Sequence, residues 1–325
     1  MMCYNYKNIE NENVDIIDII SIQELSHKLG GEKINSFLWI DEEKILLKTS
    51  LYENSSFWEY NISSKEIKEL FKISNNTFYL SKIYLTNKGY NVSEFGGYFY
   101  KIEDSVLSNE LNVENIKNDY ERFVNAMTGD ICQFDHNSRE LTLNENNIFH
   151  LPKSDVMNFP RHISVSPNNE LVSFSVLKDE YFIDKNVLLD IKTNNIIETT
   201  INLMAPYFIW IDNKPCYIDT SQKNVIAIYD SDDIKKIKIN GEAYFESSQY
   251  NLGMQNNLVA FTEKNDSFDT ISLMNINDYS IKNVFSGDNL FFSKLTLSPK
   301  CNNIAFISSN MKNLSDVNLI IARIK

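Results

Sequence analysis

Short runs of alternating apolar and polar residues, separated by turn-forming residues, fill most of this 325-residue chain. Two stretches share one layout, in which an alternating run, a Ser-Pro turn with Asn and a second apolar run follow each other. They are His162–Phe174 (HISVSPNNELVSF) and Lys294–Phe306 (KLTLSPKCNNIAF). Alternation predicts a strand with one buried face, and a tight turn between two such runs predicts a hairpin.

The same hairpin recurs along the whole chain. Two copies have Asp in place of Pro and Trp-Ile before it: Phe37–Leu47 (FLWIDEEKILL) and Phe208–Ile218 (FIWIDNKPCYI). Three weaker copies lie at Ile83–Phe95, Val124–Phe134 and Tyr250–Phe261. The first turn residue recurs about every 43 residues, at Asp41, Asn87, Thr128, Pro167, Asp212, Met254 and Pro299.

A third strand and a tight turn into a fourth follow the hairpins, as in Ser56–Ile67, Val187–Ile197, Ile226–Ile237 and Ile271–Val284. Four strands in this period form one blade of a propeller. The sequence therefore predicts an all-β fold, a seven-bladed β-propeller with four antiparallel strands per blade, as one domain over residues 1–325. A sandwich hairpin is the alternative for any single copy. The predicted blades start near residues 35, 81, 122, 161, 206, 248 and 293.

The two ends of the chain are expected to complete one blade together. After Pro299 there is room for a second strand and a third, Val317–Ile324, before Lys325. Residues Val14–Ile22 (VDIIDIISI) precede the first copy, and we expect them to form the outer strand of the last blade and so close the ring. Alternatively, a short helix predicted at Gln23–Leu29 extends back through this apolar run, which periodicity alone does not assign.

The repeats resemble those of TolB-type and prolyl-oligopeptidase-type propellers, distant relatives of WD-repeat proteins. The resemblance rests on the Ser-Pro turn, the strand ending in Ala-Phe or Ser-Phe, and a third strand ending in Asp. It implies the fold and no function, because the Gly-His and Trp-Asp pairs of WD repeats are absent and Asn-Asn or Lys-Cys follows Ser-Pro in place of Asp-Gly. The G-x-S-x-G elbow of a catalytic hydrolase domain is also absent.

Charge and composition narrow the possible partners. The net charge of −13 argues against nucleic acid and anionic membrane as partners, since both require a basic surface. Neither a signal peptide nor an apolar run of membrane-spanning length occurs, and the four cysteines are scattered, so a cytoplasmic location is expected. Phosphate-binding motifs and metal-ligand spacings are missing, so no cofactor or metal is expected. With only nine glycines, Asn and Asp should occupy many turns.

The repeat itself points to a candidate site. The innermost strand of a propeller blade lines the central channel, and its starting end opens on a face where ligands often bind. Several of the residues that the repeat places at this end are positively charged. Among them, Arg can bind a carboxylate in bidentate fashion. The predicted ligand-binding residues at the channel mouth are Lys82, Arg122, Arg161, His162, Tyr207, Gln249 and Lys294.

Two functions are compatible with such a site. The first is a binding or scaffold propeller that recognises a small anionic ligand or a protein partner. The second is a channel-mouth enzyme, a lyase, isomerase or hydrolase, in which His162 is the candidate acid or base and an arginine holds an anionic substrate. Alternatively, these are ordinary rim residues paired with acids such as Asp155 or Glu246. Trp39 and Trp210 lie within the strand pattern and are predicted to pack in the core.

Overall fold

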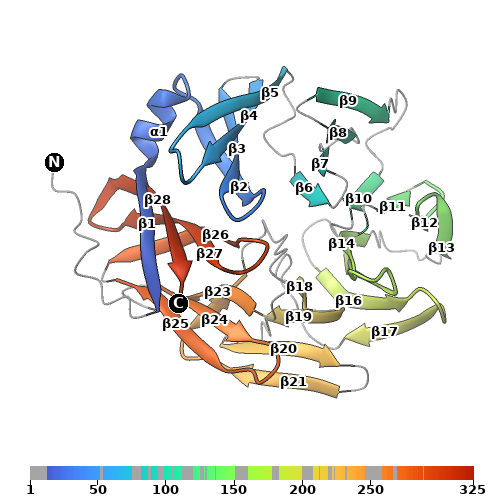
Figure 1. The fold of residues 1–325 in the computed structure, drawn as a ribbon. Helices are drawn as coiled ribbons and strands as arrows, with labels where there is room; N and C mark the ends of the chain where they lie inside the picture. Colours follow the sequence, from blue (N-terminus) through green and yellow to red (C-terminus); the bar gives the residue numbers. More distant parts are fainter. Residues whose placement is uncertain are drawn as a thin grey trace. The chain divides into compact units, whose positions relative to one another are not determined.

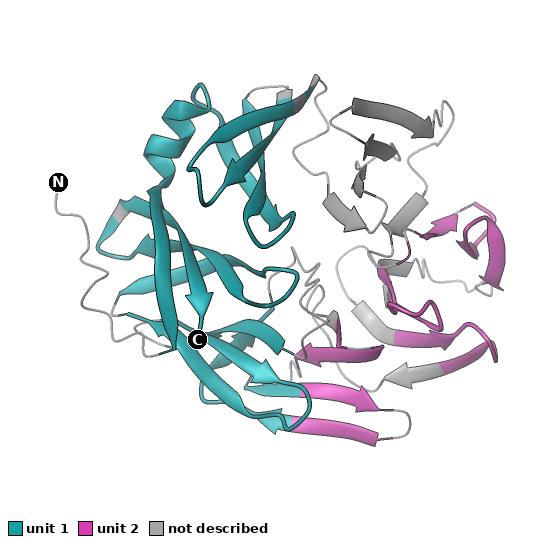
Figure 2. Ribbon diagram, in the orientation of Figure 1, with its two compact units in different colours: residues 1–79, 223–226, 237–325 teal, residues 80–222, 227–236 magenta. Residues whose placement is uncertain are grey.

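Strands form nearly all of the regular structure in the computed structural model. The chain divides into two compact units: unit 1 comprises residues 1–79, 223–226 and 237–325, and unit 2 comprises residues 80–222 and 227–236 (Figure 2). The structure describes residues 13–51, 54–74, 82–86, 89–93, 99–103, 106–111, 120–124, 128, 130–135, 137–150, 160–177, 183–199, 208–211, 213–218, 222, 224–230, 233–245, 258–265, 269–287 and 289–325.

In unit 1 the described strands form three four-stranded sheets (Figure 1). The first is β2 (Lys33–Trp39), β3 (Lys44–Leu51), β4 (Asn54–Asn61) and β5 (Ile67–Ser74). The second is β22 (Glu242–Tyr244), β23 (Leu258–Lys264), β24 (Asp269–Asn275) and β25 (Ile281–Ser286). The third, here named the terminal sheet, has the order β26 (Leu290–Leu297), β27 (Asn303–Asn310), β28 (Asn313–Ile324) and β1 (Val14–Ser21).

Unit 2 contains three more sheets of the same order and most of a fourth. They are β6 (Lys82–Thr86), β7 (Gly89–Ser93), β8 (Phe99–Glu103) and β9 (Val106–Leu111); β10 (Tyr120–Val124), β11 (Ile131–Asp135), β12 (Glu140–Leu143) and β13 (Asn146–His150); and β14 (Pro160–Val165), β15 (Leu171–Leu177), β16 (Ile183–Asp190) and β17 (Asn195–Thr199). The fourth is β18 (Phe208–Ile211), β19 (Lys214–Ile218), β20 (Val225–Asp230) and β21 (Asp233–Lys238), of which Val225, Ile226, Ile237 and Lys238 belong to unit 1.

The all-β class and the four-stranded antiparallel sheets are confirmed. Six of the first strands begin within three residues of the predicted starts. The remaining predicted start, near residue 248, lies outside the described residues, and the first described strand of that sheet is Glu242–Tyr244. This strand has only three residues, which is too short for alternation to reveal it. Most of the hairpin predicted at Tyr250–Phe261 lies outside the described residues.

The terminal sheet contains both ends of the described chain. Strand β1 pairs antiparallel with β28, from Val14 opposite Ile324 to Ser21 opposite Asn318, with a bulge between Ile16 and Asp18. The outer position expected for the N-terminal segment is therefore the observed one. Helix α1 (Ile22–Lys28) does not extend back through the segment; it begins directly after β1, where the Ser21 hydroxyl caps it by accepting the Glu24 N–H.

The terminal sheet packs on both faces inside unit 1. Against the β22–β25 sheet, the rings of Phe285, Phe292 and Phe306 meet edge to face with centroids 4.9 to 5.4 Å apart. Against the β2–β5 sheet, Leu319 and Ile321 join a cluster that includes the helix residue Leu25. Because sheets cover both faces, the middle strands are almost continuously buried, whereas the outer strand β25 is half exposed.

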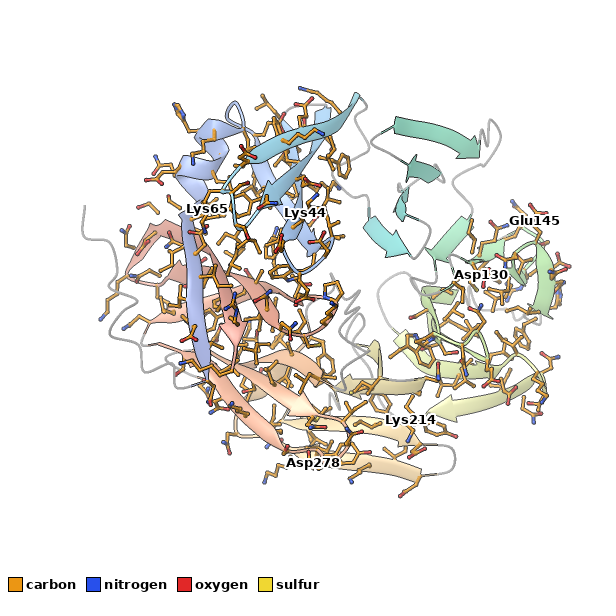
Figure 3. The ribbon with its side chains drawn as sticks, viewed as in Figure 1. Lys44, Lys65, Asp130, Glu145, Lys214 and Asp278 are labelled. Atoms are coloured by element: carbon orange, nitrogen blue, oxygen red, sulfur yellow. The ribbon has the colours of Figure 1, made fainter. Side chains whose placement is uncertain are left out.

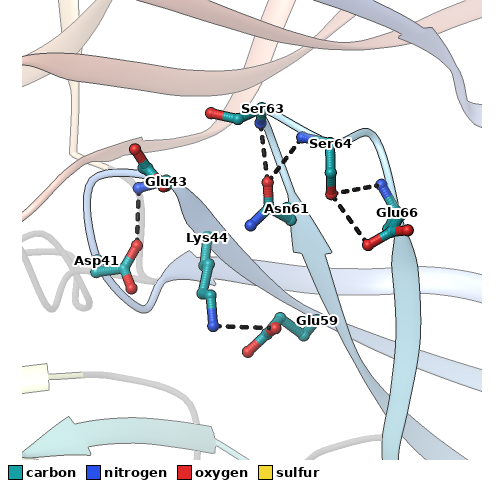
Figure 4. Close-up of polar contacts among 8 residues, drawn as sticks. All are labelled: Asp41, Glu43, Lys44, Glu59, Asn61, Ser63, Ser64 and Glu66. Atoms are coloured by element: carbon teal, nitrogen blue, oxygen red, sulfur yellow. Dashed lines mark hydrogen bonds and ion pairs between the residues drawn. The ribbon is translucent and has the colours of Figure 1, made fainter.

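Asparagine and aspartate hold many of the turns, as expected. Asn144, Asn169, Asn194 and Asn289 have positive φ. In the β4–β5 turn the Asn61 side chain accepts the Ser63 and Ser64 N–H groups at 3.0 and 2.9 Å, and in the β2–β3 turn Asp41 accepts the Glu43 N–H at 2.7 Å (Figure 4). Local side-chain acceptors thus replace glycine in shaping these turns.

In each of the two Trp-Ile copies, the indole donates a hydrogen bond to another sheet. Trp39 Nε1 in β2 donates to the Thr296 carbonyl in β26 at 3.2 Å, and Trp210 Nε1 in β18 donates to the Ser164 hydroxyl in β14 at 2.7 Å. Thr296 and Ser164 both stand three residues before the turn proline of their own copy. Both indoles are buried, at 2% and 5% exposure, so their predicted core packing is confirmed.

Three cysteines lie in the core. Burial raises the pKa of the Cys132 and Cys216 thiols, and burial with the nearby Glu42 carboxylate raises the pKa of Cys301 to about 12. The folded state therefore holds these protons more tightly than the unfolded chain does, so thermal stability should fall as the pH rises above about 8.5, the ordinary thiol pKa.

Alkylation followed by peptide mass spectrometry tests this prediction. At pH 8, iodoacetamide should leave Cys132, Cys216 and Cys301 unmodified in the native protein and label all three in denaturant. Equal labelling in both states would contradict the burial on which the prediction rests.

Candidate functional site

Two of the predicted site residues occupy equivalent bulges. In β26, Lys294 and Leu295 together face Phe306, because Ser293 pairs with Ile307 and Thr296 with Ala305. In β14, His162 and Ile163 face Phe174 in the same way, because Arg161 pairs with Ser175 and Ser164 with Ser173. A bulge inserts one residue, twists the strand and redirects a side chain, and bulges are common beside functional sites.

Lys294 has a backbone conformation that a lysine rarely adopts. Its φ is 55°, in the left-handed region, which costs a non-glycine residue about 1 kcal/mol or more unless the surroundings compensate. Its ammonium group donates to the Asn35 carbonyl in β2, and the Asn35 amide donates to the Ser50 hydroxyl in β3 at 2.7 Å. Asn35 itself is a bulged residue, between the Ile34–Thr49 and Ser36–Lys48 pairs.

The group formed by Lys294, Asn35 and Ser50, named here the Lys294 node, links β26 to strands β2 and β3. It offers an ammonium group, an amide and a hydroxyl, which are donors suited to a carboxylate or phosphate. Lys294 was among the predicted site residues, whereas Asn35, Ser50 and Lys48 were not. Lys48 lies opposite Ser36 and is only 1% exposed; the polar residues inside the apolar run KILLKTSL were the available signal.

The other predicted site residues are placed only in part. Lys82 begins β6, Arg122 lies in β10, and Arg161 and His162 lie in β14, so all four are on the first strands of their sheets as expected. Their side chains lie outside the described part of the structure, as do Tyr207 and Gln249 and the acids Asp155 and Glu246. The convergence of these residues stays a prediction.

Arg122 and Arg161 do not share one strand position. Arg161 pairs with Ser175, the residue after the buried Phe174, whereas Arg122 pairs with Gln133, the residue before the buried Phe134. Relative to these phenylalanines, Arg122 therefore stands two residues nearer its hairpin turn than Arg161 does. The two arginines therefore occupy different positions along the first strands of their sheets.

A buried glutamate fixes the loop before β2. Glu32 is 4% exposed; its Oε1 accepts the Ser56 hydroxyl at 2.7 Å, and its Oε2 accepts the Thr49 hydroxyl. Trp58 Nε1 donates to Thr49 Oγ1 at 2.9 Å, and Lys72 Nζ lies 3.7 Å from Glu32 Oε1. These contacts attach the loop at the start of β2 to the middle strands β3 and β4, which holds Asn35 in place.

The β22–β25 sheet has a similar attachment, but here the glutamate lies in a strand and binds the loop. Glu263 in β23, also 4% exposed, accepts the Ser272 hydroxyl, and its second oxygen accepts the Gly241 N–H at 3.3 Å. A Cβ at residue 241 would lie 2.7 Å from the Lys264 carbonyl oxygen, so only glycine fits there. The loops at the starts of β2 and β22 are thus rigid supports.

Hairpin turns of neighbouring sheets are also joined by side chains. In unit 1, Glu42 accepts the Ser298 hydroxyl at 2.8 Å and the Lys300 N–H at 2.6 Å. In unit 2, Asn169 donates to Asp130, which Figure 3 labels, and Asn168 N–H donates to Asn213 Oδ1 at 3.0 Å. These contacts order the turn ends of the sheets within each unit.

Comparisons with known proteins find likeness in structure only. No family model and no curated protein matches the chain. Its structure is similar to the β-propeller domain of Cps50 (Swd1) from Myceliophteria thermophila, with a TM-score of 0.55, 8% identity, and 96% of this chain and 100% of that chain covered. For an oligogalacturonate lyase from Vibrio parahaemolyticus, the TM-score is 0.57 and the identity 10%, with 95% of this chain and 92% of that chain covered. For the C-terminal WD40 domain of Sif2, the TM-score is 0.53 and the identity 10%, with 95% of this chain and 98% of that chain covered.

These likenesses span nearly the full length of each chain, and at this identity they show the fold alone. The chain is a β-propeller, distantly similar to the WD40 type, and the resemblance expected from its repeats is confirmed at that level. Among the described residues, no three His, Cys, Asp or Glu side chains gather as metal ligands would. Within the same part of the chain, no helix has the length and apolarity needed to cross a membrane.

Proposed function

We propose that this chain is a single-domain, seven-bladed β-propeller, closed by its N-terminal strand, that recognises a partner at the face where the first strands begin. The seven four-stranded sheets of the described residues support the blade count, and the pairing of β1 with β28 supports closure. The printed names of the neighbours include a WD40 domain and a lyase, so the fold does not choose between binding and catalysis.

The observation that carries the recognition site is the Lys294 node. A bulged lysine in the left-handed region is a costly arrangement, and such strain concentrates at functional sites. His162 has the equivalent bulged position in β14 and follows Arg161, which extends the same chemistry to a second sheet. Lys82, Arg122, Tyr207 and Gln249 are further candidates for contact with the ligand, which we propose to be anionic.

Anion-dependent stability tests this proposal. Succinate or phosphate that binds only the folded protein should stabilise it by about 2.7 kcal/mol at a hundred times the dissociation constant. The variant Lys294→Asn should abolish most of that gain, because it removes the ammonium group while Asn tolerates positive φ, so the unliganded protein should stay folded. Thermal unfolding at rising anion concentration measures both effects.

Lys44→Gln is the matched control. Lys44 is an exposed lysine of the adjacent β2–β5 sheet, paired with Glu59 at 3.2 Å (Figure 4), and its loss should leave the anion response unchanged. Equal stabilisation of the wild-type protein and Lys294→Asn would show that the anions act elsewhere or without specificity. That result would remove the recognition site from the proposal and leave the propeller intact.

A further inference from the structure

Two large apolar side chains are exposed together at one corner of the terminal sheet. Among the described residues, only four large hydrophobic side chains are strongly exposed, namely Ile19, Ile196, Phe291 at 39% and Met311 at 40%. Phe291 lies at the start of β26, and Met311 lies in the turn between β27 and β28 (Figure 1). Two of these four exposed side chains therefore lie at one end of the terminal sheet.

Strand pairing places Phe291 and Met311 on the same face. Phe291 pairs with Ser309, and the Met311 N–H donates to the Asn289 carbonyl at 2.9 Å, which continues the ladder by one step. Met311 is thus the diagonal neighbour of Phe291, a relation that brings long side chains within reach of each other. Val317, opposite Ser309 on β28, continues this row toward the core.

A cation accompanies this patch. Lys312, next to Met311, is exposed and has no ion-pair partner within the described ranges. The corner thus combines two exposed apolar side chains with an exposed ammonium group. Met and aromatic residues are also enriched at the centres of protein interfaces.

We propose that the Phe291–Met311 patch is a docking surface for a peptide segment of a protein partner, one that places an apolar side chain beside a carboxylate. The apolar side chain would cover Phe291 and Met311, and the carboxylate would lie near Lys312. This inference rests on the proposed function, a recognition propeller, and names the chemistry of its partner. The patch binds through exposed side chains and does not require the anion site at the Lys294 node.

Selection from a random peptide library with the full chain as bait tests the proposal. The selected peptides should be enriched in sequences with Asp or Glu beside a large apolar residue. Their affinity, measured by fluorescence anisotropy, should fall at least tenfold in the double variant Phe291→Ser with Met311→Ser. In Lys312→Gln the affinity should fall about two- to fivefold, the range expected for one exposed ion pair.

Ile196→Ser is the matched control, because Ile196 is equally exposed, at 46%, on a different sheet. It should bind the peptides as the wild-type protein does. Failure to select any binding peptide, selection of peptides without acidic residues, or equal affinity for the double variant would each overturn the proposal. Sedimentation of the unliganded chain tests whether a second copy of the chain covers the patch instead. Dimers of the wild-type protein that the double variant abolishes would assign the patch to a second copy and overturn the peptide-docking proposal.

The succinate and phosphate titration separates this inference from the proposed function. An anion response that depends on Lys294, together with failed peptide selection, would overturn only the docking surface. Peptide binding that depends on Phe291 and Met311, without any anion response, would support the docking surface and overturn the anion site. Lys44→Gln should be neutral in both assays.

Discussion

Removal of residues 1–21 is expected to yield insoluble protein. Strand β1 is the outer partner of β28 from Asn318 to Ile324. Its side chains join both core clusters of unit 1, Val14 on one face and Ile17 and Ile20 on the other. Its loss exposes an apolar strand edge, which templates aggregation. It also removes interactions comparable to the whole stability of a domain, about 5–15 kcal/mol.

Asp18 adds side-chain contacts to this strand. Its Oδ2 lies 2.7 Å from Lys65 Nζ, and it accepts the Tyr60 hydroxyl, so β1 is attached to the β2–β5 sheet as well as to β28. Burial and Asp18 raise the pKa of Tyr60, and the phenol therefore keeps its proton as the donor. The truncation should thus loosen two sheets of unit 1 rather than one.

A rearranged chain is the control for the truncation. The Lys325 N–H donates to the Asn13 carbonyl at 2.9 Å, so the end of β28 already meets the start of β1 as in a hairpin. Residues 13–21 appended after Lys325 through an Asn-Gly turn should therefore restore soluble protein to the truncated chain. Solubility, sedimentation and thermal unfolding measure the outcome. A truncated chain that remains monomeric, with unchanged unfolding, would contradict the role given to β1.

Glu32→Ala should cost about 3–5 kcal/mol of the free energy of unfolding, because several buried donors lose their acceptor at about 1–3 kcal/mol each. The donors are the hydroxyls of Ser56 and Thr49, and the Trp58 indole in turn donates to the Thr49 hydroxyl. Glu32→Gln keeps one acceptor oxygen and the side-chain volume, so its cost should be clearly smaller. Urea unfolding measures both variants.

Glu59→Ala provides the comparison for this effect. Glu59 lies in the same sheet and its contact with Lys44 is on the surface, so its removal should cost about 1 kcal/mol or less. If Glu32→Ala and Glu59→Ala were equally stable, the buried network would not be the support that we assign to the loop before β2. Glu32→Ala should also weaken the anion response, because that loop positions Asn35.

The hairpin repeat was predictable because its signals are local. Alternating strands, Ser-Pro turns and the Trp-Ile pairs before Asp41 and Asp212 depend on neighbours in sequence, and each corresponds to a strand or turn in the structure. The pairing of Val14–Ser21 with β28 was predicted because a count of the strands left the last blade without its outer strand. These features needed no knowledge of side-chain partners.

The candidate site was less predictable because its features depend on distant contacts. Nothing near Lys294 in sequence signals its positive φ, which depends on the bulge opposite Phe306 and on Asn35, in a different sheet. The different strand positions of Arg122 and Arg161 depend on strand pairing, which the apolar pattern does not define. Nothing near Glu32 in sequence indicates its burial, because its partners Thr49 and Ser56 come later in the chain.

The division of the terminal sheet between the two ends of the chain also affects how the protein is made. At typical synthesis rates of about 5–20 residues per second, β1 leaves the ribosome roughly 15 to 60 seconds before β28 does. During this interval the apolar run VDIIDIIS has no strand to pair with. Asp15 and Asp18 interrupt it with charge, as residues that suppress aggregation do. Pairing between the chain ends has the highest possible contact order, so we expect this step to be the last and slowest in folding.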